Sequence, residues 1–145
     1  MPALSVQPRT WRPLGPRIAA AVFSAVLVGA FAYLWLSFDQ ETKEEVNLVQ
    51  RITVVVMVGV GVALLHALAR SKVVARDSGL VLVNGYRRRE YEWAEIIAIR
   101  MPPGAPWPTL DLADGTTVSV LGIHGSDGRR ATEAVRELKG LLDPG

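Results

Sequence analysis

The chain has 145 residues, half of them hydrophobic and 21% charged, with a formal net charge of +2. The absence of cysteine excludes disulfides, thiolate metal sites and a cysteine nucleophile. The small net charge argues against a nucleic-acid partner. With only two histidines and no cluster of ligand residues, we expect no metal site and no cofactor.

The chain begins with a basic segment, residues 1–17, which carries three arginines and no acid. Residues 18–38 have no charged side chain and would span roughly 31 Å as a helix, close to the thickness of a bilayer's hydrocarbon core. We therefore predict a transmembrane helix over 18–38. A cleaved signal peptide is the alternative, because Ala30-Phe31-Ala32 has the small-x-small form. The apolar run continues past that site, however, and a second run follows.

An acidic loop over residues 39–51 leads to a second uncharged run, residues 52–69, which is interrupted only by His66. This run would span roughly 27 Å as a helix. Soluble helices of such length nearly always carry a polar stripe, which both runs lack. The two runs therefore predict a membrane hairpin with His66 near the headgroups. A ligand or proton-transfer role for His66 is the alternative.

The cationic residues predict how the hairpin is oriented. Three arginines precede the first helix, and Arg70, Lys72 and Arg76 follow the second, whereas the loop between the helices has four acids and two cations. Segments rich in lysine and arginine stay on the cytoplasmic side of a membrane. We expect a multi-pass protein of the inner (plasma) membrane, with both termini in the cytoplasm and the 39–51 loop outside.

Small residues recur at four-residue spacing in both apolar runs. Such a stripe lets two helix backbones approach closely. We predict that these residues pack the two helices of one hairpin together; a homodimer seam, and hence a homo-oligomer, is the alternative. The residues are Ala21, Ala25, Gly29, Gly59, Ala63 and Ala67.

Residues 71–145 have the mixed charge of a small soluble domain, which we expect in the cytoplasm. Turn signals at Asp77-Ser78-Gly79, Asn84-Gly85 and Asp114-Gly115 separate short β-prone runs. The proline-rich stretch 101–108 predicts a loop, since proline cannot donate to a central ladder. This pattern predicts five or six antiparallel strands.

An amphipathic helix is expected from about Ser126 to Leu142, with apolar residues at i, i+3, i+4 and i+7 and with Ser126 or Asp127 capping its start. The fold class is therefore α+β: a two-helix membrane hairpin, then a small antiparallel sheet and one C-terminal helix. The helix must cover one face of the sheet or plug the open end of a curled sheet, as in a pleckstrin-homology (PH) domain.

Four ordered stretches resemble the bacterial PH-like domains of the low molecular weight protein antigen type, found in small actinobacterial membrane proteins. They run from Asp77 to Asn84, Glu92 to Ile96, Leu110 to Gly115 and Arg130 to Val135. The resemblance implies a PH-like open barrel and membrane residence. It implies no established chemistry and carries no catalytic or binding residue.

Three places in this domain are candidate sites. Arg87, Arg88 and Arg89 follow the Asn-Gly turn and are candidates for contact with anionic lipid headgroups; a solvated basic hairpin is the alternative. Trp107 lies among prolines and is a candidate for contact with a partner or the bilayer. The Gly125–Gly128 loop before two arginines has the form of an anion-binding helix start, which the acidic Asp127 opposes.

Catalysis has little support, because His124 has no identifiable nucleophile or acid beside it. We therefore expect a non-enzymatic membrane protein whose PH-like module binds membrane or cytoplasmic proteins as an adaptor or assembly factor. A module that senses anionic lipids through Arg87–Arg89 is the first alternative. An accessory subunit of a membrane transport complex is the second.

Overall fold

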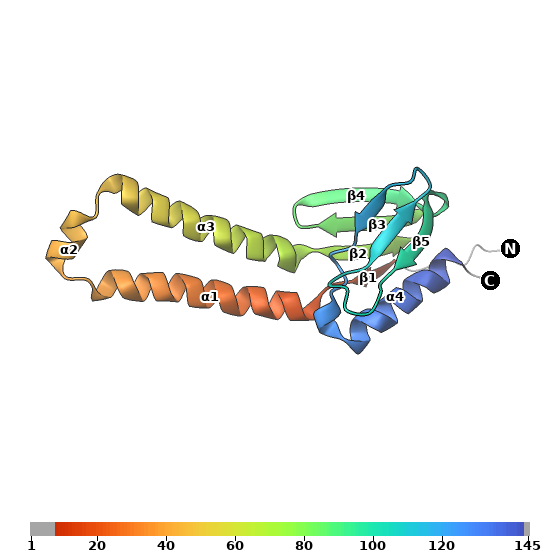
Figure 1. The fold of residues 1–145 in the computed structure, drawn as a ribbon, viewed down its shortest axis with the longest axis horizontal. Helices are drawn as coiled ribbons and strands as arrows, with labels where there is room; N and C mark the ends of the chain where they lie inside the picture. The colour runs from red at the N-terminus through yellow and green to blue at the C-terminus, as the bar shows by residue number, and fades with distance from the viewer. Residues whose placement is uncertain (1–7, 144–145) are drawn as a thin grey trace.

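A computed structural model describes residues 8–143, which form a long helical hairpin joined to a small β-rich domain (Figure 1). Residues 1–7 of the expected N-terminal segment and the last two residues of the expected domain lie outside this range. Helix α1 (Leu14–Ser37) and helix α3 (Leu48–Arg70) are both long and apolar enough to cross a membrane. They extend the predicted runs by several residues, mostly on the domain side of α1 and on the loop side of α3.

The connection between the long helices contains a short helix, α2 (Gln40–Glu45), which the sequence analysis did not predict. Asp39 caps α2 by accepting the backbone N–H of Thr42 at 2.8 Å. Hydrogen bonding from the Thr42 side chain, and then from this N–H, holds the pKa of Asp39 below its usual range. Asn47 and Gln50 form a reciprocal capping box at the start of α3. Two polar caps therefore define the turn at the far end of the hairpin.

Helices α1 and α3 pack side by side, but along a stripe that neighbours the one predicted. Leu27 lies 3.3 Å from where a Cβ on Gly61 would stand, and Ala20 is buried. By contrast, a Cβ on Gly29 or Gly59 would meet no atom within 4 Å. The exposed members of the predicted set are Ala21, Ala25, Gly29, Gly59 and Ala63, and only Ala67 is half-buried. Sequence spacing defines a stripe, whereas the connections at both ends of the hairpin decide which stripe meets the partner helix.

The domain contains two antiparallel sheets. Sheet A has the order β1-β2-β3-β4 and sheet B the order β5-β6-β7. A 3₁₀ turn (Trp93–Glu95) joins β4 to β5, and the loop 101–108 joins β5 to β6 as predicted. The strands are β1 (Arg9–Trp11), β2 (Lys72–Arg76), β3 (Gly79–Asn84), β4 (Arg87–Glu92), β5 (Ile96–Arg100), β6 (Thr109–Leu112) and β7 (Thr117–Ser119).

Strand β1 comes from the N-terminal segment and was not predicted. Thr10 pairs with Val74 of β2, so the chain contributes an edge strand to sheet A before it enters α1. The first helix is therefore attached to the domain at its start, just as α3 is attached at its end. The β-domain thus draws on residues from both sides of the hairpin.

Two of the predicted turns lie at slightly different positions from those expected. Asn84 pairs with Arg87, so the β3–β4 turn is Gly85-Tyr86, with Gly85 at φ +64° as the first central residue. Asn84 stays extended, because its side chain bridges the two sheets: it donates to Ser119 O at 2.6 Å and accepts from Leu121 N at 3.0 Å.

The β6–β7 connection is a longer turn than the predicted Asp-Gly pair. Gly115 N donates to Leu112 O at 3.0 Å, Leu112 N donates to Thr116 O at 2.9 Å, and Gly115 has φ +85°. A glycine in the left-handed region after a β-turn is typical of three-residue hairpin loops. Asp114 accepts both the N–H and the hydroxyl of Thr116, which lowers the pKa of Asp114.

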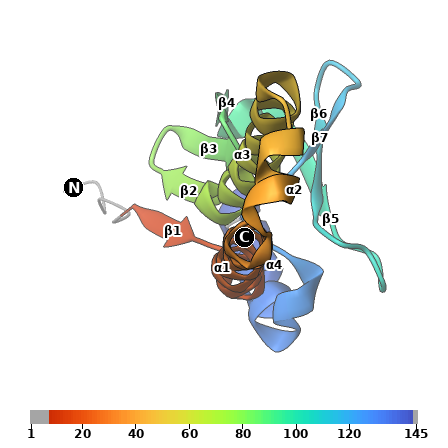
Figure 2. The same cartoon turned by 90° about the vertical axis from the view of Figure 1, so that its left-hand side faces the viewer.

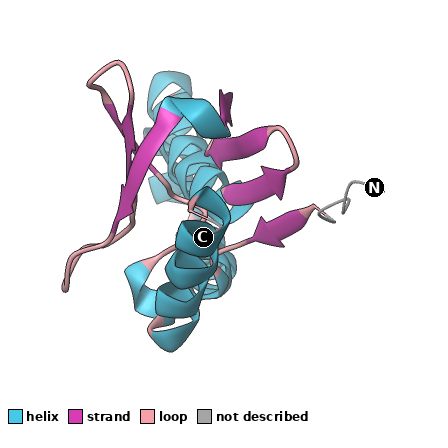
Figure 3. Ribbon diagram, turned by 90° about the vertical axis from the view of Figure 1, so that its right-hand side faces the viewer, coloured by secondary structure: helices cyan, strands magenta, loops and turns pink. Residues whose placement is uncertain are grey.

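Helix α4 (Arg129–Leu142) closes the opening between the two sheets, which lie on either side of it when the molecule is viewed along its length (Figure 2 and Figure 3). Its apolar stripe joins a single core with residues from both sheets, as the second predicted arrangement requires. The largest fully buried side chains of this core are Val73, Leu80, Leu82, Leu110, Val120 and Leu138.

Helix α4 begins three residues later than predicted, after a 3₁₀ turn (Gly125–Asp127). Gly128 occupies its N-cap position without a side-chain cap. Asp127 instead accepts the backbone N–H groups of Leu14 and Gly15, at 3.0 and 2.7 Å. Pro13 supplies no cap to α1, so an acid from the domain caps the first long helix and ties the two parts together.

Candidate functional site

A cationic pocket lies where the long helices meet the domain, and we call it the junction pocket. It encloses about 490 Å³ and is built from the link into α1, the last turns of α3, and strands β2 to β4. Its walls carry five cationic side chains and no acidic one. The lining residues are Arg12, Arg17, His66, Ala69, Arg70, Lys72, Val83, Tyr86 and Arg88.

Tyr86 forms the centre of one wall of the junction pocket. Its hydroxyl donates to Ala63 O at 3.0 Å and lies 2.9 Å from Nδ1 of His66. Because the hydroxyl has a single proton, Nδ1 of His66 is the donor in the second bond. The guanidinium of Arg70 stacks 5.0 Å from the centre of the Tyr86 ring. His66 therefore anchors the β3–β4 turn to helix α3.

A second anchor lies beneath this turn at Ser71, which is fully buried. Its hydroxyl donates to Ala67 O at 3.1 Å and accepts Gly85 N at 2.9 Å. Together with the Asp127 cap on α1, these contacts hold the pocket walls in place from three directions. The junction pocket is therefore a preformed feature of the fold.

The three consecutive arginines do not act as one cluster. They lie in strand β4, where side chains alternate between faces, and Arg88 pairs across from Val83. Only Arg88 lines the junction pocket, whereas Arg87 and Arg89 lie on the other face of the strand. The three predicted headgroup-contact residues therefore do not share one face, because β4 begins at Arg87 and its side chains alternate.

Arg88 is the one pocket cation with an ion-pair partner among residues 8–143. Its Nη2 lies 2.6 Å from Oε1 of Glu90, and the hydrogen bond from Arg88 lowers the pKa of Glu90. A lowered carboxyl pKa adds stability above the unfolded-state value of about 4.3, and this contribution is lost as the pH falls through the folded-state value. The pair is therefore intact at neutral pH.

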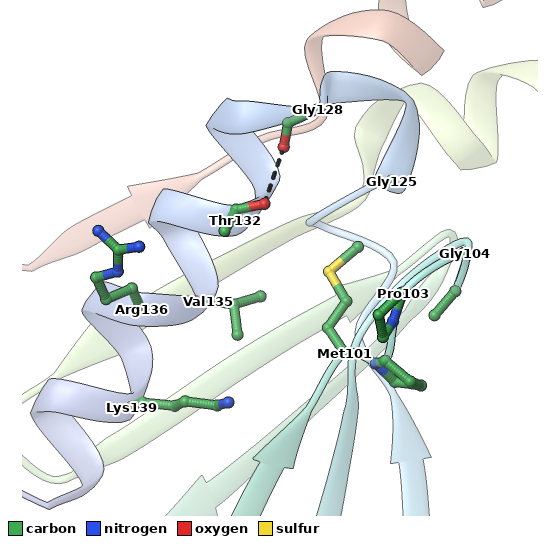
Figure 4. Close-up of a pocket in the computed structure, with 11 residues that line it drawn as sticks. Met101, Pro103, Gly104, Gly125, Gly128, Thr132, Val135, Arg136 and Lys139 are labelled. Carbon is green, nitrogen blue, oxygen red and sulfur yellow. Dashed lines mark hydrogen bonds between the residues drawn. The ribbon is translucent and has the colours of Figure 1, made fainter.

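A second concavity, which we call the lateral groove, lies between α4 and the proline-rich loop (Figure 4). It encloses about 560 Å³, with Val135 and Met101 toward the core and Arg136 and Lys139 along the helix wall. Neither cation has an ion-pair partner among the described residues. The remaining lining residues are Pro102, Pro103, Gly104, Ala105, Gly125, Gly128 and Thr132.

Trp107 is half-buried beside the lateral groove, although it does not line it. Its ring centre lies 6.4 Å from that of His124, whose Nδ1 accepts Ser126 N at 3.2 Å. His124 thus caps the 3₁₀ turn. Contact of Trp107 with a partner or with the bilayer remains a prediction.

The backbone N–H groups of the Gly125–Gly128 loop are not available to an anion, because all four already have acceptors. These acceptors are Pro106 O, Nδ1 of His124, His124 O and Gly125 O. The Asp127 carboxylate, moreover, points to the start of α1. Within residues 8–143, no group of three or more His, Cys, Asp or Glu side chains is arranged to hold a metal ion.

Sequence reasoning used four of the five pocket cations only to orient the hairpin, and it named the fifth, Arg88, only as a member of the Arg87–Arg89 run. Arg12 and Arg17 precede the first helix, and Arg70 and Lys72 follow the second. Since both ends of a hairpin meet on one side, their convergence could have been inferred from topology. The participation of Arg88 could not, because it depends on the register of β3 with β4.

Comparison with known proteins agrees with this architecture. Residues 70–141 match the family described as "Bacterial PH domain". The domain that follows the two long apolar helices is therefore of PH-like type.

Relatives of the chain include uncharacterized proteins of Mycobacterium bovis and Mycobacterium tuberculosis. Each is 34% identical over 82 residues, which is 57% of this chain and 52% of the relative. The chain thus matches about half the length of these curated relatives. No solved structure matches it.

Proposed function

We propose that this chain is a non-enzymatic integral membrane protein that presents a PH-like interaction module on the cytoplasmic face of the plasma membrane. The observation that carries the membrane assignment is the exposure of both long helices. Only 6% of the apolar window of α1 and none of that of α3 is buried. Soluble monomers rarely expose continuous apolar surface on this scale, whereas lipid would cover it at no cost.

The charges at the two ends of the hairpin support a cytoplasmic domain. The junction pocket and its cations lie at the domain end. The opposite end carries α2, which has three acids and a single cation, Lys43. The positive-inside rule assigns the domain end to the cytoplasm.

Within the domain, the lateral groove is the surface best suited to a protein partner. Its volume falls in the range of ligand sites, and its loop wall contains two consecutive prolines and a glycine. Arg136 and Lys139 carry positive charge without neutralising partners in the described part of the chain. We infer that an extended, acidic segment of a partner binds here, so that the protein acts as an adaptor or assembly factor.

This proposal is tested by photocrosslinking the full-length chain in native membranes. A photoreactive residue at Thr132, in the groove, should give discrete protein adducts, and the same residue at Ala113, in the exposed β6–β7 connection, should not. Combining Thr132 with Arg136→Glu and Lys139→Glu should remove the adducts. Identical adducts from both positions, or adducts that survive the charge reversal, would contradict the proposal.

A further inference from the structure

The junction pocket concentrates positive charge that the fold leaves largely unneutralised. Arg12, Arg17, Arg70, Lys72 and Arg88 converge on it from the link before α1, from α1, from α3, from β2 and from β4. Among residues 8–143, only Arg88 forms an ion pair, with Glu90. Placing like charges around one cavity raises the energy of the empty site, and an anion in the cavity would relieve that repulsion.

The pocket walls are fixed by contacts that do not use up these cations. Tyr86 is held by Ala63 and His66, and its ring supports the Arg70 guanidinium. Arg70 can therefore stack on the ring while its N–H groups remain available to an anion. Cations that are simply exposed to solvent need no such supporting contacts, whereas the donors of a binding site do.

The position of the pocket indicates where the anion comes from. Arg17 lies in the first turn of α1 and Arg70 is the last residue of α3, so the pocket sits where the apolar helices end. In the membrane orientation proposed above, this level corresponds to the headgroups of the inner leaflet. A free phosphate compound has the same charge but no reason to gather at this depth.

We propose that the junction pocket binds the phosphate group of an anionic phospholipid headgroup, with Arg12, Arg17 and Arg70 as its principal donors. This inference rests on the proposed membrane residence and orientation. It replaces the Arg87–Arg89 run with a site in which only Arg88 of the three takes part. Bound lipid would hold the domain at a defined angle to the bilayer, because the pocket spans the hairpin and the domain.

The test uses the full-length chain in a neutral detergent and measures the shift of its Tm. The probes are dioctanoyl phosphatidylglycerol, dioctanoyl phosphatidylcholine and inorganic phosphate. We expect phosphatidylglycerol to raise Tm saturably and phosphatidylcholine to leave it nearly unchanged. If inorganic phosphate acts at the same concentrations as phosphatidylglycerol, the lipid source is overturned. If no anion shifts Tm, the site itself is overturned.

Two matched triple variants separate the pocket from general surface charge. Arg12→Gln with Arg17→Gln and Arg70→Gln removes the three principal donors and should weaken phosphatidylglycerol binding by on the order of 100-fold. Arg87→Gln with Arg89→Gln and Arg129→Gln removes the same charge elsewhere, and should leave the affinity within about threefold. Equal losses in the two variants would overturn the proposal.

A third variant does not depend on the stability of the triple mutants. Glu90→Gln removes the acid that holds Arg88, so binding of phosphatidylglycerol should become about fivefold tighter. Unchanged or weaker binding would count against the site. Membrane topology is measured separately. Failure of this inference therefore leaves the proposed interaction module intact, and failure of the membrane assignment would appear in the topology measurement.

Discussion

Asp127 caps a helix that begins more than a hundred residues before it in the chain. Both of its carboxylate oxygens accept backbone N–H groups, from Leu14 and Gly15. A negative charge at a helix start is favourable through the helix dipole as well as through the hydrogen bonds. Gly15 suits the contact, because a Cβ there would lie 2.8 Å from Oγ of Ser126 and 3.0 Å from Asp127.

We predict that Asp127→Ala lowers the free energy of unfolding of the full-length chain by about 1–2 kcal/mol, through loss of the cap. Glu133→Ala is the matched control, since it removes an equally charged but exposed acid from α4. Thermal unfolding of both variants in detergent measures the difference. Equal stabilities would mean that the cap contributes nothing.

Asn84 shows how one side chain can join the two sheets. It satisfies both the carbonyl of Ser119 and the N–H of Leu121. The sequence marks Asn84-Gly85 as a turn on residue type alone. In the structure the turn residues are Gly85 and Tyr86, and Asn84 bridges the sheets instead. The carbonyl and N–H groups at the end of β7 need partners that their own sheet does not supply.

The β3–β4 turn is the element through which the domain contacts helix α3. Gly85 has φ +64°, and an added Cβ would lie 3.3 Å from Cβ of Ala67. The neighbouring Tyr86 forms the wall of the junction pocket. The conformation of this turn therefore determines both the attachment and the pocket.

Replacing Gly85 with alanine tests this attachment. We expect Gly85→Ala to destabilise the protein by about 1–3 kcal/mol, through its left-handed backbone and its contact with Ala67. Gly115→Ala, at φ +85° with open space around the new Cβ, should incur only the backbone cost. Chemical denaturation of both variants gives the comparison, and a Gly115 variant that proves the less stable would contradict this reasoning.

The strands and helices differ in how far local pattern predicted them. The two apolar helices, the proline-rich loop and the amphipathic α4 were identified to within a few residues. Strand β1 was missed, because three residues of a basic segment carry no period-two signal and its pairing with β2 spans the whole hairpin. The prediction of which stripe packs α1 against α3 was wrong for a related reason. The choice of stripe depends on how both ends of the two helices are held.

As a whole, the molecule has its two long apolar helices at one end and its β-rich domain at the other (Figure 1). The chain has no cysteine, so single cysteines can report the environment of any exposed position. Glu44 lies in α2, Val56 on the exposed surface of α3, and Ala113 in the domain. These three positions sample the expected outside, membrane and cytoplasm.

We predict that an impermeant maleimide labels Glu44→Cys in intact cells and Ala113→Cys only after the membrane is permeabilised. Val56→Cys should remain unlabelled until the membrane is dissolved in detergent, because lipid excludes the reagent. Labelling of Val56→Cys in intact membranes would refute membrane residence. The opposite pattern at the other two positions would show an inverted orientation.

The local sequence pattern was enough to establish the α+β class, the two apolar helices and the succession of sheet and helix. These features follow from hydrophobic period, turn residues and proline, which act over a few neighbouring positions. Three-dimensional contact alone established the Asp127 cap, the β1 pairing, the division of the three arginines and the junction pocket. Each of these joins segments separated by tens of residues, so its energy depends on which surfaces the completed fold brings together.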